Sequence, residues 1–400
     1  MRPYFTFVLI SMAACPLARS QAAPAAGVGT ADLQYAIRYS ESGEFGDSLG
    51  TWHTIDTSGS LDYTNGRKRS PFSLNFTGGY SSTIAGPSYG TGAYERLLIS
   101  QGLGFHKWSV TLSDDVGYRP QAPTTGFSGM PGTGEPIGSP NPPSSQSVLT
   151  VHTHALDNNA SGEVQHTIGR GSAFRIDVQH SLLRFPDGDG LATDQFMTGA
   201  GPTFRLNARN SLSANYEFSR FSYSDYGTHF QTHTLTFGFE RSWSRALHSK
   251  ASVGPDFVEK SGSIPSSMGV AAQAALAYEM RRFSADVNYS RATSGGSGYL
   301  MGSRSEDVTA SISRAFTQRF TFEMVGGYSH NSDLSTGQNI KGEFGSAQAS
   351  WRIGRYVNAF ASYTAMSQSS TADVPSNVLT ELVQTVTFGF GYSRELKGSK

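Results

Sequence analysis

The side chains best suited to bind a metal ion lie in two short stretches of the sequence. His152 and His154 are two apart, so on an extended chain their imidazoles face the same way and could ligate a transition metal. Asp187, Asp189 and Asp194, in "PDGDGLATD", resemble the start of a calcium loop. Neither set is complete, because the first lacks an adjacent carboxylate or third imidazole and the second lacks later oxygen ligands. We therefore expect no metal and no cofactor.

No pattern in the chain identifies a reaction. A hydrolytic site needs a nucleophile and a base that converge, and none of the ten histidines marks such a pair. The chain also lacks a G-x-S-x-G motif, a P-loop lysine and a paired-cysteine site. The sequence therefore predicts that the protein is not an enzyme.

A third set of charged residues is spread along segments in which polar and apolar residues alternate. Successive side chains of a strand point to opposite faces, so these charges share one face with Ser, Thr, Asn, Gln and Gly. The set that we predict to line an interior surface is Asp56, Asp62, Arg175, Asp177, Glu217, Glu240, Asp286 and Glu323. Arg38, Lys250, Glu279 and Glu343 are assigned to the same face. Acidic residues predominate, which favours cations if this face encloses water. Alternatively, the charges hydrogen-bond one another in a filled interior.

The elements that carry these charges are extended strands. In "FSADVNY", Phe283, Ala285, Val287 and Tyr289 alternate with polar residues, and the same two-residue period recurs in eighteen segments. Many segments reach ten residues, which matches the roughly 9 to 11 that a tilted strand needs to cross a bilayer. Strands of soluble sandwiches also alternate but are commonly shorter.

The connections between the segments alternate between short and long. Eight short ones, such as "EMRRF" and "RIGRY", each carry Lys or Arg, often beside an aromatic residue such as Trp108, Trp243 or Tyr356. The intervening ones are longer and rich in Gly, Ser, Asp and Pro. We interpret the short ones as a basic, aromatic rim that faces phospholipid headgroups. In the alternative, these arginines only end strands of a soluble sheet and discourage edge pairing.

The N-terminus indicates export. Arg2, an apolar stretch and small residues predict a signal peptide over 1–22, followed by a short linker over 23–30. Cys15, the single cysteine, lies within the signal peptide; its lipidation is an alternative because "MAAC" resembles a lipoprotein cleavage box. Thirty-one basic residues balance thirty-one acidic ones, and charged residues make up only 16% of the chain. This balance argues against a nucleic-acid partner.

Taken together, residues 31–394 resemble bacterial outer-membrane β-barrels of the porin-like kind. The terminal "TFGFGYSR" supplies Thr387, Gly389 and Tyr392 of their assembly signal, although Arg394 stands at the last aromatic position and a tail, 395–400, follows. The resemblance implies an all-β, transmembrane, antiparallel up-and-down barrel of about eighteen strands, with sixteen as the alternative. It implies short periplasmic turns, long extracellular loops and insertion by the barrel-assembly machinery into the outer membrane of a Gram-negative-type bacterium, after export to the periplasm.

A barrel of this size can hold an aqueous channel unless something fills it. The Pro/Gly-rich segment 118–159 is predicted to be a loop that constricts or covers the mouth, with a mobile surface loop as the alternative. We expect passive diffusion of small polar solutes with a mild cation preference. The alternative is a structural or adhesive barrel that binds a partner or surface polymer through its loops. Other expected partners are outer-membrane lipid and further copies of the chain in a homo-oligomer.

Overall fold

The chain folds into a single sheet of eighteen antiparallel strands that closes on itself. The computed structural model describes residues 29–44, 50–67, 69–86, 91–121, 153–169, 171–187, 190–262, 264–296, 300–371 and 382–397. The strands are β1 (Gly29–Glu44), β2 (Thr51–Asn65), β3 (Phe72–Ala85), β4 (Gly92–Gly104), β5 (Trp108–Gln121), β6 (Thr153–Thr167), β7 (Ala173–Arg184), β8 (Thr193–Arg205), β9 (Asn210–Tyr223), β10 (Thr228–Ser242), β11 (Leu247–Val258), β12 (Ser267–Met280), β13 (Phe283–Ser294), β14 (Ser303–Ala315), β15 (Phe320–Asp333), β16 (Asn339–Arg352), β17 (Val357–Ser370) and β18 (Leu382–Lys397).

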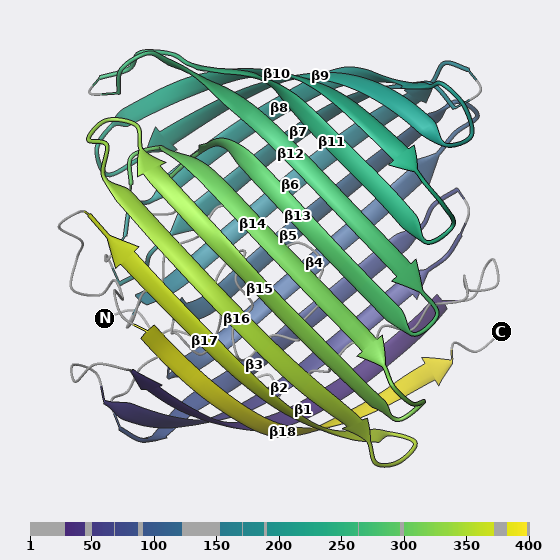
Figure 1. The fold of residues 1–400 in the computed structure, drawn as a ribbon, viewed down its shortest axis with the longest axis vertical. Coiled ribbons are helices and arrows are strands. Elements are labelled where there is room, and N and C mark those ends of the chain that lie inside the picture. Colours follow the sequence, from purple (N-terminus) through teal and green to yellow (C-terminus); the bar gives the residue numbers. More distant parts are fainter. Residues whose placement is uncertain are drawn as a thin grey trace, which may run out of the picture.

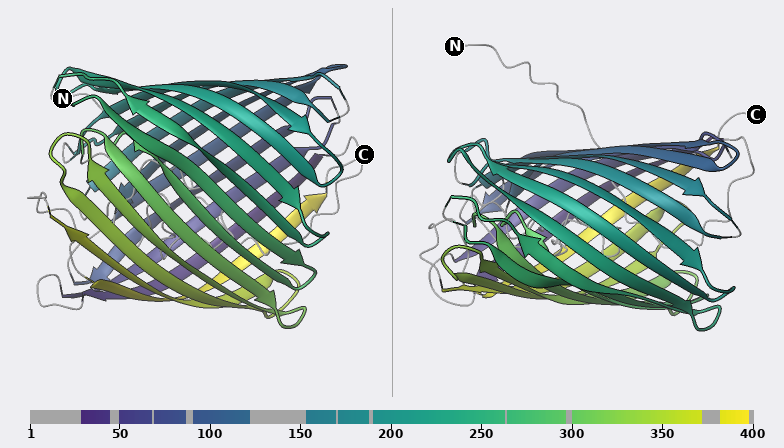
Figure 2. Two further views of the ribbon diagram at one scale, coloured as in Figure 1. Left: turned by 45° about the horizontal axis from the view of Figure 1, so that its top comes forward. Right: turned by 90° about the horizontal axis from the view of Figure 1, so that it is seen from above.

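Each strand pairs with its sequence neighbours, and β18 pairs with β1 to close the barrel. In Figure 1 the purple first strand and the yellow last strand lie side by side, and all strands run obliquely across the wall. Figure 2 shows the same closed wall from two further directions. Closure removes both sheet edges, which would otherwise expose unpaired backbone groups to lipid. The prediction of about eighteen antiparallel strands is confirmed, and the alternative of sixteen is wrong.

Four boundaries differ from those expected from the sequence. β1 begins at Gly29, inside the expected linker, and β18 runs to Lys397, inside the expected tail. β5 continues to Gln121 and β6 begins at Thr153, so both ends of the expected Pro/Gly-rich loop are paired strand. Pairing extends this far because backbone hydrogen bonds tolerate Pro120 near a strand end. The rest of that segment, like the signal peptide and Cys15, lies outside the described residues.

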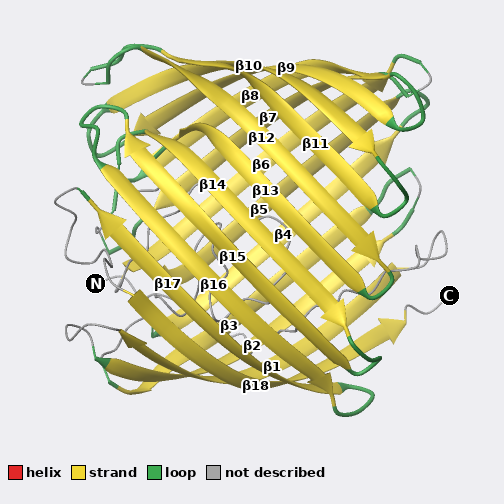
Figure 3. Cartoon of the chain, viewed as in Figure 1, coloured by secondary structure: helices red, strands yellow, loops and turns green. Residues whose placement is uncertain are grey.

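Figure 3 shows strands and loops in the described part of the chain. No helix among the described residues is long and apolar enough to cross a membrane.

The eight short connections all fall at one rim of the barrel, as predicted. Basic side chains there lie over neighbouring aromatic rings: the guanidinium of Arg241 is 4.0 Å from the ring centre of Trp243, and that of Arg355 is 5.2 Å from Tyr356. Arg314 covers Phe316 in the same way, at 4.8 Å. Such amphipathic pairs suit the boundary between hydrocarbon and headgroups.

An apolar outer band separates this rim from a belt of polar side chains. Trp351 lies at the short-turn end of β16. The outward Glu343 lies eight residues away on the same strand, toward the long-loop end. The same interval separates Arg241 from His233 on β10. Eight residues at about 3.3 Å each, tilted by about 40°, span roughly 20 Å, close to the ~25 Å apolar height of outer-membrane barrels. Exposed Phe237, Phe239 and other large apolar side chains fill the band. The protein is therefore an outer-membrane β-barrel, as predicted.

Candidate functional site

The eight charged residues predicted to line the interior stand at inward strand positions. They alternate with exposed outward side chains, among them Ile55, Ile176, Tyr216, Phe239, Val287 and Met324. The strand registers carry Asp56, Asp62, Arg175, Asp177, Glu217, Glu240, Asp286 and Glu323 to the opposite face. The structure does not bring them into one site, because they are distributed over six strands around the wall. Whether they line an open pore stays a prediction.

The inner face of β1–β7, here called the arginine arc, holds arginines that are each paired with carboxylates. Arg96 donates two hydrogen bonds to Asp115, from Nε at 2.9 Å and from Nη2 at 2.6 Å. Arg175 lies 3.3 Å from Asp177 and 3.6 Å from Glu163. The positive charges of this arc are therefore largely compensated within the wall.

The most buried pair of the arginine arc is Arg38 with Asp56, whose side chains are 8% and 14% exposed and 3.6 Å apart. Tyr94 donates a hydrogen bond to Asp56 Oδ1 at 3.0 Å. To reach β2 from β4, the Tyr94 ring crosses β3 at Gly79, where an added Cβ would stand 2.5 Å from the ring. Glycine is needed at this position because any side chain there would displace the ring.

The inner face of β9–β15, here called the carboxylate arc, holds acidic groups whose hydrogen-bond donors are hydroxyls and amides. Ser219 donates to Glu217 at 3.4 Å, and Ser313 donates to Glu323 at 3.2 Å. Asp286 accepts hydrogen bonds from Ser311 and from the Asn288 side chain. Within the described ranges, no ion pair joins Glu217, Asp286 or Glu323 to a basic side chain. Negative charge is therefore less compensated here than on the arginine arc.

Lys250 stands opposite Glu240 on the adjacent strand, so the carboxylate arc also contains a cation. Glu240 accepts a hydrogen bond from Ser211 at 3.4 Å.

Inward positions 340–350 of β16, 358–370 of β17 and 383–393 of β18 carry no charged side chain. Hydroxyl pairs such as Ser346 with Thr364, at 2.8 Å, join neighbouring strands. The prediction that Glu343 faces inward is wrong: Phe344 is buried above Gly327, and its neighbour Glu343 is exposed on the outer face. The pattern misled because β16 carries large apolar residues on its inner face, which reverses the usual relation between polarity and direction.

Apolar residues gather at the long-loop end of the wall in what we call the mouth cluster: Phe221, Tyr223, Phe230, Val258 and Ile264. All five are nearly fully buried, and the Phe221 and Phe230 rings stack with centroids 4.7 Å apart. Loop residues Leu191, Met301 and Leu334 pack against them. Because these contacts come from several connections, the cluster ties the long-loop rim together.

The β13–β14 hairpin packs against this cluster. Its described end residues, 292–296 and 300–305, are here called the hairpin tip. The Tyr223 hydroxyl donates to the Gly295 carbonyl at 3.0 Å. An added Cβ on Gly295 would lie 3.1 Å from Thr193 Cγ2 on β8, and one on Gly302 would lie 2.8 Å from the Phe230 ring. The tip therefore leaves the line of the wall and narrows the mouth.

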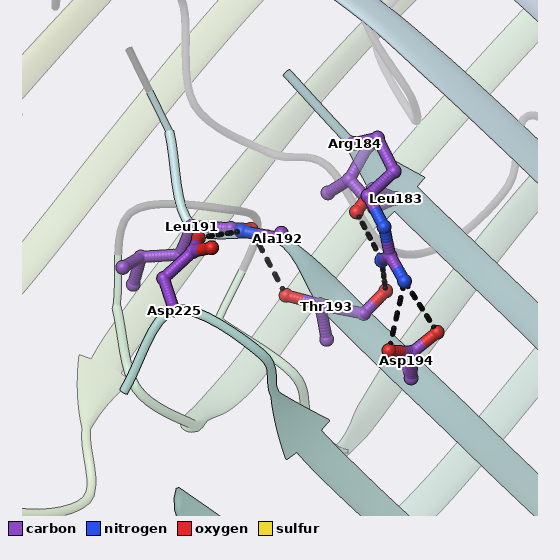
Figure 4. Close-up of polar contacts among 7 residues, drawn as sticks. All are labelled: Leu183, Arg184, Leu191, Ala192, Thr193, Asp194 and Asp225. Carbon is purple, nitrogen blue, oxygen red and sulfur yellow. Dashed lines mark hydrogen bonds and ion pairs between the residues drawn. The ribbon is translucent and has the colours of Figure 1, made fainter. Parts of the chain in front are cut away.

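A second rim contact involves one residue of the calcium-like stretch. Figure 4 shows Arg184 and Asp194 joined by two hydrogen bonds from Nη2, both 2.8 Å long. The backbone N–H of Ala192 donates to Asp225 Oδ2 at 3.2 Å. The Asp194 carboxylate thus holds two strand ends together, which suits a turn rather than a calcium loop. Asp189 lies outside the described residues.

His154 of the predicted histidine pair bonds to a loop carboxylate. Its Nδ1 lies 2.6 Å from Asp187 Oδ2, its backbone N–H donates to the same oxygen at 2.9 Å, and its ring stacks on Tyr118. Partial burial alone would raise the pKa of Asp187, but these hydrogen bonds lower that pKa below its ordinary value. His152 lies outside the described residues, and no three of the described His, Cys, Asp and Glu residues gather as a metal site.

Sequence reasoning missed the mouth cluster. The inward positions of β9 read Glu217, Ser219, Phe221 and Tyr223, so the inner face changes from polar to apolar toward the long-loop end. Continuing the two-residue period of β9 past its polar inward residues would have predicted that Phe221 and Tyr223 face inward. Which loops pack on the cluster could not be found this way, because they are distant in sequence.

No protein-family model matches the chain, and no curated protein matches its sequence. The chain is similar to several solved structures along nearly its whole length. OpdQ of Pseudomonas aeruginosa is 12% identical with a TM-score of 0.47, covering 92% of this chain and 99% of that one. OccK2 (OpdF) of Pseudomonas aeruginosa in complex with glucuronate is 11% identical with a TM-score of 0.49, covering 93% and 100%. OccAB3 of Acinetobacter baumannii is 13% identical with a TM-score of 0.48, covering 92% and 99%.

Proposed function

We propose that the barrel is a passive outer-membrane channel for small polar solutes with a mild cation preference. The observation that carries this proposal is the unequal compensation of charge on the inner wall. Each of Arg38, Arg96 and Arg175 is paired with a carboxylate, whereas Glu217, Asp286 and Glu323 are hydrogen-bonded by neutral groups. A low-dielectric wall focuses the field of such carboxylates into the lumen and enriches cations there.

The direct test is the single-channel conductance of the refolded mature protein in a planar bilayer. Stable open steps would support the channel. The absence of steps from protein that is folded, as judged by its β-sheet circular dichroism and protease resistance, would contradict it. That result would favour the alternative, a structural or adhesive barrel whose long loops bind a partner or surface polymer.

The Pro/Gly-rich connection is tested by deleting residues 123–147, which lie between β5 and β6. If this segment constricts the lumen, the deletion enlarges the conductance steps. Unchanged steps would contradict that role and would leave the hairpin tip as the main narrowing.

A further inference from the structure

The wall of the barrel is interrupted between β12 and β13. Their ladder ends at the pair formed by Ala272 and Arg291, although β12 continues to Ser267 and β13 continues to Ser294. On its other side β12 remains paired with β11 as far as Ser267. Residues 267–271 thus form a strand margin that β13 does not pair with, and we call this interruption the seam.

The hairpin tip lies on the inner side of the seam. The Thr293 hydroxyl donates to Asp256, which is 2% exposed and faces inward from β11, two strands away. Arg304 Nη2 donates to Ser267 Oγ at 3.1 Å, and its guanidinium is 3.0 Å from where a Cβ on Gly269 would stand. These side chains cross the inner face of β12. The tip therefore overlaps the wall from within, and side-chain contacts replace the backbone ladder.

On the β12 side the outer surface beside the seam is apolar, whereas exposed Arg291 of β13 stands where the ladder ends. The polar belt passes through His233 on β10, and the register places Phe257 of β11 and Met268 of β12 in the same row. Met268 is 72% exposed, and Val270 below it is 50% exposed. On this margin the apolar surface reaches the level of the polar belt, close to where β12 begins.

Apolar side chains also stand behind the seam. Val258, next to Phe257 in the chain, belongs to the mouth cluster together with Ile264 of the β11–β12 connection. The mouth cluster therefore lies on the inner side of the paired strands β10–β12, next to the hairpin tip that covers the seam.

We propose that the seam is a lateral portal through which small uncharged apolar molecules pass between the mouth cluster and the outer leaflet. In the present conformation the hairpin tip closes it through Thr293 and Arg304. The portal opens when the tip moves away from β12, where side-chain contacts rather than a ladder hold it. Because β14 stays paired with β15 as far as Ser303, the end of β15 moves with the tip. This route is separate from axial diffusion of polar solutes and does not depend on it.

The outer margin is tested with the apolar fluorescent probe N-phenylnaphthylamine in Gram-negative cells that express the full chain. The portal predicts several-fold faster probe entry than in cells with an empty vector. Met268→Glu places a charge on the margin and is expected to remove at least half of this increase. Met280→Glu is the matched control, because Met280 is an exposed outward methionine at the opposite end of the same strand. Equal entry with both variants, or no increase with the parent chain, would overturn the proposal.

Movement of the tip is tested with engineered disulfides. Thr193→Cys with Gly295→Cys would tie the tip to β8, since an added Cβ on Gly295 lies 3.1 Å from Thr193 Cγ2. Ser294→Cys with Ser303→Cys is the control, because these paired residues cross-link the hairpin only to itself. The first disulfide is expected to slow probe entry until a reductant is added, and the second is expected to have no effect. Failure of the first disulfide to form, or unchanged entry once it has formed, would contradict the portal.

Single-channel conductance of the same variants separates the two proposals. If Met268→Glu slows probe entry while ion conductance persists, both routes exist and are distinct. Loss of probe entry without any conductance in the parent chain would support the portal and contradict the polar channel. Ion conductance without probe entry in the parent chain would support the polar channel and contradict the portal.

Discussion

The strands of the arginine arc and those of the carboxylate arc share the same alternation of residues, yet the charges of the two arcs have different surroundings. On the arginine arc, Arg38 and Asp56 form a largely buried ion pair, and Tyr94 donates a hydrogen bond to Asp56. On the carboxylate arc, Glu323 and Asp286 are held by hydroxyl groups. Each of Arg38, Arg96 and Arg175 on the first arc lies beside a carboxylate, although Asp62 there is hydrogen-bonded only by amides. Under the proposed function, the carboxylates of the second arc act on mobile ions.

From this difference we expect the two arcs to have different roles, one in stability and one in ion selectivity. Buried pairs are costly to break because the remaining partner keeps its charge without compensation. Carboxylates bonded to hydroxyls can lose their charge and keep much of their hydrogen bonding as amides. We therefore expect substitutions on the arginine arc to change stability and substitutions on the carboxylate arc to change ion selectivity.

The largest expected effect is that of Arg38→Met. It leaves Asp56 buried without its cation, so the free energy of unfolding should fall by about 3–5 kcal/mol. Denaturant unfolding in lipid vesicles, followed by tryptophan fluorescence, measures this change. The matched control on the other arc is Glu323→Gln, for which we expect a loss of less than ~1 kcal/mol. Similar losses for both variants would remove the distinction between the arcs.

A smaller effect on stability but a clear one on selectivity is expected when Glu217→Gln, Asp286→Asn and Glu323→Gln are combined. Neutralising these groups should bring the cation-to-anion permeability ratio toward one, because the uncompensated negative charge is removed. The reversal potential in a salt gradient measures that ratio. Lys250→Gln should shift the ratio the opposite way, since it removes the cation opposite Glu240. An unchanged ratio in both variants would show that these side chains do not face the ion path.

The smallest expected effect concerns Asp187, which lies outside both arcs. Its lowered pKa means that the ionised carboxylate stabilises the fold. This contribution is fully present above the ordinary pKa of a carboxyl group and is lost as pH falls through the lowered one. Because Asp187 is 40% exposed, the contribution should be below about 1 kcal/mol. Asp187→Asn should lower the melting temperature slightly at neutral pH and have no effect near pH 2. A pH-independent difference would contradict the ionic contribution.

The strand pattern predicted the barrel well because its cause is local. Successive side chains face lipid and interior in turn, so Ile176 beside Asp177 already indicates two environments. The prediction failed for Glu343 because the polarity of a residue indicates its direction only where the inner face is polar. On β16 the neighbouring apolar residue, Phe344, points inward, and Glu343 therefore points outward. The partners of Arg38 and the packing of Gly295 on β8 depend on register and on contacts between distant segments. These features could not be predicted from one sequence.

The most direct test of the central claim is the reversal potential of the unmodified protein in a planar bilayer with a potassium chloride gradient. The channel with an uncompensated carboxylate arc predicts stable ion-conducting steps and a reversal potential of the sign that cation preference gives. A reversal potential of the opposite sign, or no current through folded protein, would contradict it.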